Sequence, residues 1–348
     1  MARRVRSTIF SRAIQRSLKA LTRSAVRAGT TAVKQALRPS KPAARKRAPA
    51  KTTAARPRAA AAVKLPNGFT AGIAGAQRYR LFVPPGLRQT AGLPLLVMLH
   101  GCSQTTEAFA ASTRMNQIAA KEGFVVLYPE QNKLANLQGC WNWHQTSSGK
   151  AQTEADAIFA TILQVGQRQA IDSRRIALAG LSAGASMAAL LAVRHPGLFR
   201  AIAMHSGIAP GMAHSLTGAL KAMRGHSVAA PLLPLSTGTH LPALLVIQGS
   251  ADHVVAPSNG STVAQLWATR EAAKPGQARV VQRGARYPAP VIDYNARGRL
   301  VATLCDIKGL GHAWSGGAAS QAYSDPKGPD ASRMIWAFAL KQFAKVAA

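Results

Sequence analysis

Acidic residues are scarce in this chain of 348 residues, and they are absent from its first hundred positions. The sequence has 44 Lys and Arg against 12 Asp and Glu, a formal net charge of +32, and its first carboxylate is Glu107. Between Met1 and Lys64 there are 18 basic residues and no acidic ones, whereas the remainder carries a net charge of +14. This division predicts a basic arm with a linker, residues 1–64, followed by one globular domain, residues 65–348.

Cysteines and long apolar runs are also few. Cys102, Cys140 and Cys305 allow one bridge at most, which excludes a disulfide-based scaffold. No apolar run approaches the roughly 20 residues that a transmembrane helix needs. Arginines interrupt every apolar stretch near the N-terminus. We therefore expect neither a secretory signal peptide nor a twin-arginine signal.

The arm itself has two parts. Residues 5–37 carry an apolar stripe and a basic stripe at helical spacing on nearly opposite faces, which predicts a basic amphipathic helix. Residues 38–64, rich in Pro, Ala and Lys or Arg, read as an extended linker. Three roles stay open: docking on a granule or anionic membrane surface, non-specific binding of nucleic acid, and a disordered tether or cleaved leader.

Beyond the arm, short apolar runs alternate with helical stretches. Helices are expected near 154–169 and 187–194, and an irregular insertion at 208–240 is placed to cap a site. Because the apolar runs do not alternate with polar residues, they predict an α/β fold with a mostly parallel sheet that is flanked by helices. The expected strands are Tyr79–Val83, Leu95–Leu99, Phe124–Tyr128, Arg175–Ala179, Ala201–His205, Leu244–Ile247 and Val301–Ile307.

Ser182 lies in the pentapeptide Gly180-Leu181-Ser182-Ala183-Gly184, between an apolar strand and an Ala-rich helix. A serine at such a strand-to-helix elbow is exposed at the sheet edge, and small neighbours permit close packing. The helix N-terminus then stabilises negative charge that develops beside the serine. This context predicts that Ser182 is a catalytic nucleophile, rather than a serine at an ordinary turn.

A serine hydroxyl needs a base and an orienting acid, which α/β-hydrolases supply in the order Ser, acid, His. Asp252 follows the expected strand 244–247, and His312 lies in a Gly-rich loop after the expected strand 301–307. We therefore assign Asp252 as the acid and His312 as the general base. Asp293 and Asp306 are rival acids, and His253 is disfavoured because it adjoins Asp252.

An oxyanion hole is expected from two backbone N–H groups. The first belongs to Ala183, which follows the nucleophile, and the second to Cys102 in the loop His100-Gly101-Cys102-Ser103. The alternative that Cys102 is itself the nucleophile has less support, because no base is indicated for it.

Five segments together resemble the polyhydroxybutyrate depolymerase family of esterases, which is related to feruloyl and acetylxylan esterases. They occur in family order and are LHGCSQ at 99–104, CWNW at 140–143, AGLSAGASMA at 179–188, IQGSADHVV at 247–255 and GLGHAWSGG at 309–317. The resemblance implies an α/β-hydrolase fold and a Ser182–Asp252–His312 triad without metal or cofactor. It also implies a Cys102–Cys140 disulfide, with Cys305 left as a buried thiol.

The expected activity is that of a serine esterase on short-chain hydroxyacyl esters, as in polyhydroxybutyrate depolymerases. The alternatives are a feruloyl or acetylxylan esterase and, in a different class, a binding protein with an inactive site. Trp141, Trp143 and Trp314 offer flat apolar area for an acyl chain, or else they anchor the core. The family implies an extracellular location, and the alternative is a cytoplasmic, granule-associated protein. The oligomeric state is not predicted.

Overall fold

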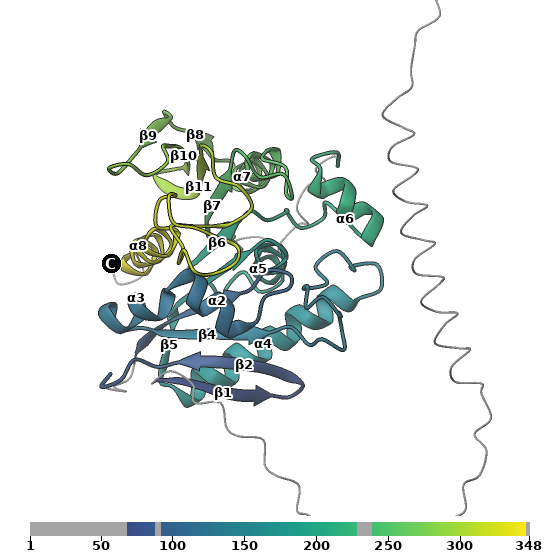
Figure 1. The fold of residues 1–348 in the computed structure, drawn as a ribbon, viewed down its shortest axis with the longest axis vertical. Helices are drawn as coiled ribbons and strands as arrows, with labels where there is room; N and C mark the ends of the chain where they lie inside the picture. The colour runs from purple at the N-terminus through teal and green to yellow at the C-terminus, as the bar shows by residue number, and fades with distance from the viewer. Residues whose placement is uncertain (1–67, 88–91, 228–238, 346–348) are drawn as a thin grey trace, which may run out of the picture. The chain divides into compact units, whose positions relative to one another are not determined.

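A computed structural model describes residues 68–87, 92–227 and 239–345 (Figure 1). All of them belong to one unit, Val63–Ala348. The expected arm and linker lie outside the described residues, as does the part of the expected insertion that spans 228–238. The predicted boundary between residues 64 and 65 therefore stays a prediction.

One large sheet forms the centre of the described domain, with the strand order β1-β2-β4-β3-β5-β6-β7-β11-β10-β8, and β9 also pairs with β10. The strands from β4 to β11 in this order are mutually parallel, and antiparallel strands close both edges. The bounds in the parallel part are β4 Val125–Glu130, β3 Leu93–Leu99, β5 Ile171–Leu181, β6 Ala201–His205, β7 Ala243–Gly249 and β11 Arg299–Ile307. The edge strands are β1 Phe69–Ala74, β2 Gln77–Phe82, β8 Lys274–Pro275, β9 Arg279–Val281 and β10 Ala289–Ala296.

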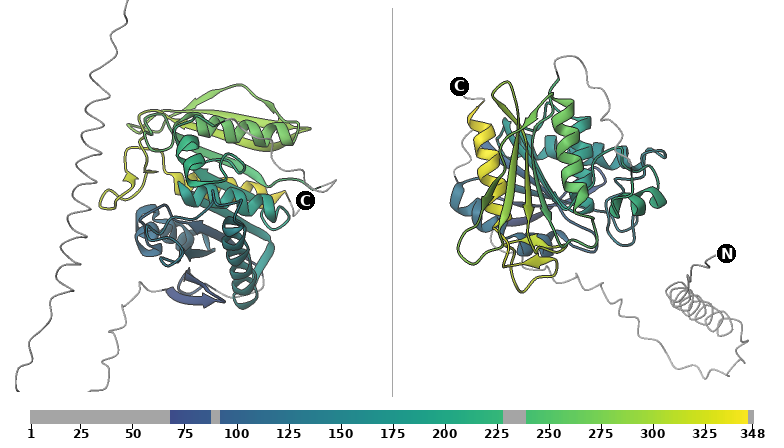
Figure 2. Two further views of the ribbon diagram at one scale, coloured as in Figure 1. Left: turned by 90° about the vertical axis from the view of Figure 1, so that its right-hand side faces the viewer. Right: turned by 90° about the horizontal axis from the view of Figure 1, so that it is seen from above.

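Helices cover both faces of this sheet, as the view from above shows (Figure 2). One face is covered by α4 Lys150–Arg168, α5 Ala183–Arg194 and α7 Ser258–Arg270. The other face is covered by α2 Thr106–Thr113, α3 Met115–Glu122 and α8 Ala331–Ala344. The described part also contains α6 Leu216–Met223 and the small pair β12 Trp314–Ser315 and β13 Ser324–Asp325.

The core divides into two apolar clusters because successive side chains of a strand point to opposite faces. In β3, Leu95, Val97 and Leu99 pack toward α4 and α5. Their neighbours Leu96 and Met98 pack toward α2, α3 and α8. All seven residues of β3 are buried, which explains why the sequence of this strand is uniformly apolar.

The predicted mostly parallel sheet with flanking helices is therefore confirmed, and each of the seven expected strands is present. Sequence reasoning did not identify β1, which pairs antiparallel with β2. No helix in the described ranges combines the length and apolar character that crossing a bilayer demands.

Candidate active site

The sharp elbow predicted at Ser182 is present. Ser182 directly follows β5 and caps α5, with φ 56° and ψ −120°. A non-glycine residue in this region of backbone space is strained, and it persists only where the surrounding structure holds it. The N–H of Ser182 donates to the carbonyl of His205 at 2.9 Å, and its carbonyl accepts from the N–H of Ser186 at 3.0 Å.

Two glycines make this elbow possible, as the sequence predicts. A Cβ atom on Gly180 would lie 2.4 Å from the carbonyl carbon of Gly184. A Cβ atom on Gly184 would lie 2.2 Å from the carbonyl oxygen of Leu99 and 2.4 Å from that of His100. The first turn of α5 can therefore approach the end of β3 only because both positions lack a side chain.

The predicted acid and base meet at the same edge of the sheet. Asp252 follows β7 and His312 follows β11, and Nδ1 of His312 lies 2.8 Å from Oδ2 of Asp252. The Asp252 side chain is fully buried and that of His312 is 12% exposed. The rival acids have other partners, because Asp293 pairs with Arg279 and Asp306 pairs with Lys308.

The surroundings of Asp252 favour its ionised form. Burial by itself would raise the pKa of this carboxyl group, but the hydrogen bond and charge of His312 and two backbone N–H groups outweigh it and lower the pKa. Those N–H groups belong to Val254 and Val255 and lie 2.9 and 2.8 Å from Oδ1. Asp252 can thus accept a hydrogen bond from the Nδ1–H group of His312. This leaves Nε2 of the ring unprotonated and free to act as a base.

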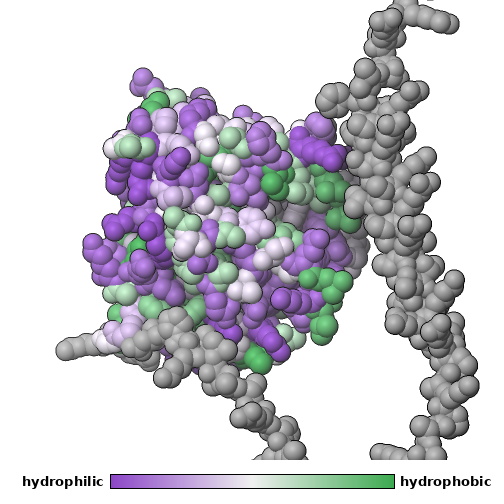
Figure 3. Space-filling view, in the orientation of Figure 1, coloured by the Kyte–Doolittle hydropathy of each residue, from purple (hydrophilic) through white to green (hydrophobic). Residues whose placement is uncertain are grey.

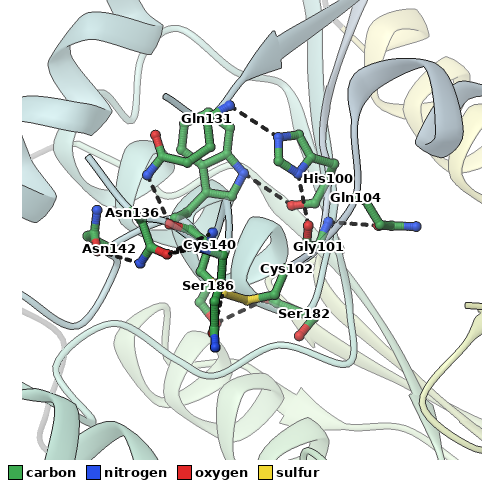
Figure 4. The surroundings of a disulfide bond; sticks show 12 residues. His100, Gly101, Cys102, Gln104, Gln131, Asn136, Cys140, Asn142, Ser182 and Ser186 are labelled. Atoms are coloured by element: carbon green, nitrogen blue, oxygen red, sulfur yellow. Dashed lines mark hydrogen bonds between the residues drawn. A yellow bond between two sulfur atoms is a disulfide. The ribbon is translucent and has the colours of Figure 1, made fainter. Parts of the chain in front are cut away.

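The loop after β3 lies beside the nucleophile and is fixed by a disulfide. Cys102 and Cys140 are bonded, with their Cα atoms 4.3 Å apart, and Figure 4 shows Ser182 next to this bond. This is the pairing that the family resemblance implies. Cys305 is a free, buried thiol, and burial raises its pKa to about 12, so it has no thiolate character near neutral pH.

Hydrogen bonds hold the same loop from several sides. His100 accepts the N–H of Gln131 through Nε2 at 3.1 Å, and the His100 carbonyl accepts Nε1–H of Trp141 at 3.1 Å. The side chain of Gln104 accepts the N–H of Gly101 at 2.9 Å (Figure 4). The loop is therefore a rigid element of the site.

The two N–H groups predicted for the oxyanion hole are available. In the part of the chain that the structure describes, neither the N–H of Cys102 nor that of Ala183 donates to another protein group. Ala183 is buried and Cys102 is partly buried, and two unpaired backbone donors beside a nucleophile are suited to a ligand oxygen. Alternative use of Cys102 as a nucleophile is ruled out in this structure, because its sulfur is bonded to Cys140.

The prediction of three substrate-binding tryptophans needs correction. Trp141 and Trp314 are fully buried, and their Nε1–H groups donate to the His100 carbonyl and to Oγ of Ser332. Both are anchoring residues that present no surface to a substrate. Trp143 is only partly buried and packs against the core, so it stays a prediction as a substrate contact.

Sequence reasoning missed His205, the last residue of β6. It is fully buried, its ring stacks on Trp314, and its carbonyl holds the N–H of Ser182. The sequence did contain a signal for His205, because this residue ends the expected strand Ala201–His205, as Asp252 and His312 follow the ends of theirs. The described residues contain no group of three or more His, Cys, Asp or Glu side chains suited to a metal ion.

Comparison with known proteins identifies the family. Residues 77–272, more than half of the chain, match the family model described as esterase PHB depolymerase. The chain belongs to the PHB depolymerase family of esterases. The resemblance drawn from the five sequence segments is thereby confirmed.

Among its relatives, poly(3-hydroxyalkanoate) depolymerase C of Paucimonas lemoignei is 33% identical over 194 residues, which cover 53% of this chain and 46% of that protein. A probable acetylxylan esterase A of Aspergillus clavatus is 28% identical over 209 residues, covering 54% of this chain and 64% of the relative. The matches thus span about half to two thirds of the length of these curated relatives.

A solved structure shares the fold of this family member. The acetyl xylan esterase from Aspergillus awamori aligns with a TM-score of 0.55 at 20% identity, covering 68% of this chain and 89% of that chain. This likeness confirms the predicted α/β-hydrolase fold.

Proposed function

We propose that the protein hydrolyses carboxylic esters through an acyl-enzyme formed on Ser182. The observation that carries this proposal is the Asp252–His312 hydrogen bond of 2.8 Å at the sheet edge where Ser182 occupies a strained elbow. The three residues follow β5, β7 and β11 in the chain order Ser, acid, His, which is the order of α/β-hydrolases.

In the proposed mechanism, Nε2 of His312 takes the proton of Ser182 while the serine oxygen attacks the ester carbonyl carbon. The imidazolium then gives this proton to the leaving alcohol, and an acyl-serine results. A water molecule, deprotonated by His312, then attacks the acyl carbon. The imidazolium returns this proton to the Ser182 oxygen as the bond between that oxygen and the acyl carbon breaks, and the acid is released. Asp252 holds the ring and stabilises the imidazolium without taking the proton itself.

The N–H groups of Ala183 and Cys102 stabilise the negative charge on the carbonyl oxygen in both steps. Removal of one such donor in other enzymes lowers kcat by about 10²–10³. The disulfide and the hydrogen bonds of His100 support this role, since they fix the backbone of Cys102 before the substrate arrives.

We propose a short-chain hydroxyacyl polyester as the substrate class. The family match and the poly(3-hydroxyalkanoate) depolymerase relative support this class. So does the surface beside the site, where Leu134 and Leu137 are 93% and 91% exposed. The loop that carries them is joined to the oxyanion loop, because the N–H of Ser103 donates to the carbonyl of Gln138 at 2.9 Å.

Apolar side chains are visible on the side of the domain where this loop and α6 lie (Figures 1 and 3). Leu216 and Leu220, one helical turn apart on α6, are 65% and 47% exposed. Apolar surface of this kind is suited to contact with a solid apolar ester rather than with a small hydrated one.

An acetylxylan esterase activity is the second candidate, because acetylxylan esterases are among the relatives. Both activities use the same acyl-enzyme chemistry and differ in which ester enters. Parallel assays on 3-hydroxybutyrate oligomers, methyl ferulate and acetylated xylan separate them. Release of acetate from xylan with no cleavage of the oligomers would replace the depolymerase assignment.

We propose an extracellular location, with a cytoplasmic, granule-associated protein as the alternative. The Cys102–Cys140 disulfide supports the former, since disulfides persist in oxidising compartments and are rare in the cytosol. Fractionation of the native host with an antibody against the catalytic domain tests it. Recovery of all the protein with the cytosol or with granules would contradict it.

The decisive experiment on the mechanism is Ser182→Ala. We expect kcat on a p-nitrophenyl ester to fall by about 10⁴–10⁶ with an unchanged circular dichroism spectrum. Ser186→Ala is the matched control, because Ser186 lies one turn along α5 and binds the backbone of Ser182 and Ile208 rather than substrate. Full activity of the purified Ser182→Ala protein would overturn the proposal.

A further inference from the structure

His205 connects the element that carries the nucleophile to the element that carries the base. It ends β6, which lies between β5 and β7 in the sheet, and it pairs in register with Leu181, the residue before Ser182. Its carbonyl oxygen accepts the N–H of Ser182 at 2.9 Å. Its imidazole Nε2 accepts the N–H of Ser315 at 3.1 Å, three residues after His312.

The hydrogen bonds define the tautomer of this ring. Because the N–H of Ser315 can only donate, Nε2 of His205 must be unprotonated. The ring proton is therefore on Nδ1, which lies 3.2 Å from Oγ of Ser206. The ring also stacks on Trp314 with centroids 5.2 Å apart, so it contacts the His312 loop by its edge and by its face.

The ring is also kept neutral. Burial and the nearby charge of His312 lower the pKa of His205 to about 3, against a smaller opposing effect of Asp252. His312 and Asp252 are the titratable groups that act on it. A protonated His205 would lose its acceptor for Ser315 and would place a positive charge beside the proposed base. A neutral acceptor avoids both effects.

We propose that His205 is a positioning residue that holds the His312 loop against the Ser182 elbow through its Nε2 acceptor. The inference rests on the proposed function of Ser182 and His312. It also accounts for the complete burial of Trp314 and Ser315, since the two residues form the part of the loop that His205 holds. His205 touches neither the substrate nor the reacting atoms in this role.

Variants of His205 that place a hydrogen-bond acceptor at different distances from the backbone distinguish the positioning role from a merely structural one. In His205→Gln the amide oxygen can occupy the place of Nε2, whereas in His205→Asn it comes closer to the place of Nδ1. His205→Phe keeps the ring that stacks on Trp314 and has no acceptor. His195→Phe is the matched control, because His195 also stacks on an aromatic ring, that of Phe159, at the opposite end of α5.

We expect His205→Phe and His205→Asn to lower kcat by about 30- to 100-fold, as a displacement of about 1 Å does in other enzymes. KM should change by about twofold or less, because no substrate contact is lost. His205→Gln should recover kcat to within about fivefold of the wild-type value, and His195→Phe should keep it. If His205→Phe does not fold, the difference between the Gln and Asn variants decides the question.

A second readout does not depend on esterase activity. We expect the hydrogen-bonded Nδ1 proton of His312 to give a far-downfield proton resonance, which is identified by its loss in His312→Gln. We expect this signal to broaden or shift in His205→Asn and to return in His205→Gln. Equal kcat and equal spectra for the Gln and Asn variants would overturn the positioning role. Failure of the Ser182→Ala test would instead overturn the proposed function, and the spectra would still test His205.

Discussion

Nδ1 of His312 lies 2.8 Å from Oδ2 of Asp252, and the carboxylate belongs to a side chain with no exposed surface. Its other oxygen, Oδ1, accepts the N–H groups of Val254 and Val255. The carboxylate is thus held by the backbone of its own loop before it meets the imidazole. The orientation of His312 is set by a rigid acceptor rather than by a mobile surface side chain.

Replacement of Asp252 by Asn tests this relationship. An amide oxygen can still accept from Val254 and Val255, so we expect a folded protein. The amide cannot provide the negative charge that selects the Nδ1–H tautomer of His312, and kcat/KM should fall by about 10³–10⁴. Asp293→Asn, which removes the rival acid bonded to Arg279, should leave kcat/KM nearly unchanged. A reversed pattern would assign the acid to Asp293.

Gly184→Ala tests the close packing of the elbow. The added Cβ atom would lie 2.2 Å from the carbonyl oxygen of Leu99, so α5 or the end of β3 must shift. We expect the unfolding free energy to fall by about 1–3 kcal/mol, as for overpacking in a dense core. Activity should fall more steeply, because the shift separates the N–H groups of Ala183 and Cys102.

Gly166→Ala is the control for this variant, because it adds the same methyl group at a glycine where there is room for it. A Cβ atom at this position of α4 meets no atom within 4 Å. We expect it to raise the unfolding free energy by about 0.5–1 kcal/mol, because alanine is the better helix former. Chemical denaturation of both variants provides the measurement, and a stable, active Gly184→Ala protein would refute the packing argument.

Two buried histidines give the stability of the domain a pH dependence of known sign. Burial lowers the pKa of His100 to about 4, and burial together with His312 lowers that of His205 to about 3. Below pH 6.5, the ordinary value, the unfolded chain binds protons that the folded protein does not bind. The unfolding free energy should therefore fall on acidification, by about 1.4 kcal/mol per pH unit for each histidine.

Denaturant unfolding at pH 6.0, 5.5 and 5.0 measures this slope. The His205→Gln variant has one such imidazole fewer, so its slope should be smaller by about 1.4 kcal/mol per pH unit. The window lies above the ordinary pKa values of the carboxyl groups, which limits their contribution. An identical slope in the two proteins would show that His205 is protonated in the folded state.

The arrangement of the three proposed catalytic residues was predictable from the sequence because its signals are local. Ser182, Asp252 and His312 each follow a short apolar run, and in a parallel sheet the ends of such runs meet at one edge. The glycines around Ser182 also have a local cause, since only they permit the close approach of α5 to β3. The fold class and the order of the three residues therefore follow from the sequence alone.

Other features depend on contacts between distant parts of the chain. In the sequence, Trp141 and Trp314 cannot be distinguished from exposed binding residues. Only their complete burial and their ring contacts with His100 and Phe109 show that they are anchors. The role of His205 depends on a contact with Ser315, 110 residues away. The edge strand β1 was missed because only its first and last residues, Phe69 and Ala74, are buried, so no apolar run marks it.

Removal of the disulfide tests how far it fixes the oxyanion loop. In the variant Cys102→Ala/Cys140→Ala, a cross-link across 38 residues is lost, and the unfolding free energy should fall by about 4 kcal/mol on the chain-entropy model. We expect kcat to fall by about tenfold or more, as the N–H of Cys102 loses its fixed position. Cys305→Ala, which removes the free thiol, should keep kcat. Unchanged kcat in the double variant would show that hydrogen bonds alone hold the loop.

Replacement of Leu134 and Leu137 tests whether adsorption to a solid substrate can be lost while ester cleavage is kept. Both are more than 90% exposed, and their loop is braced by Lys150, whose Nζ donates to the carbonyl of Ala135 at 2.6 Å. Leu134→Ser/Leu137→Ser should therefore keep the loop while it removes apolar contact area worth roughly 1.5–3 kcal/mol for each fully buried leucine.

We expect the double variant to keep kcat/KM on a soluble p-nitrophenyl ester and to lose about tenfold or more of its adsorption to suspended poly(3-hydroxybutyrate) particles. Leu163→Ser is the matched control, since Leu163 is also exposed but lies on α4, outside this loop. A similar loss in both proteins would indicate a general effect of surface hydrophobicity. If the double variant loses activity on the soluble ester as strongly as it loses adsorption, the two leucines belong to the catalytic site. A substrate as small as a p-nitrophenyl ester would contact them only in a shared pocket.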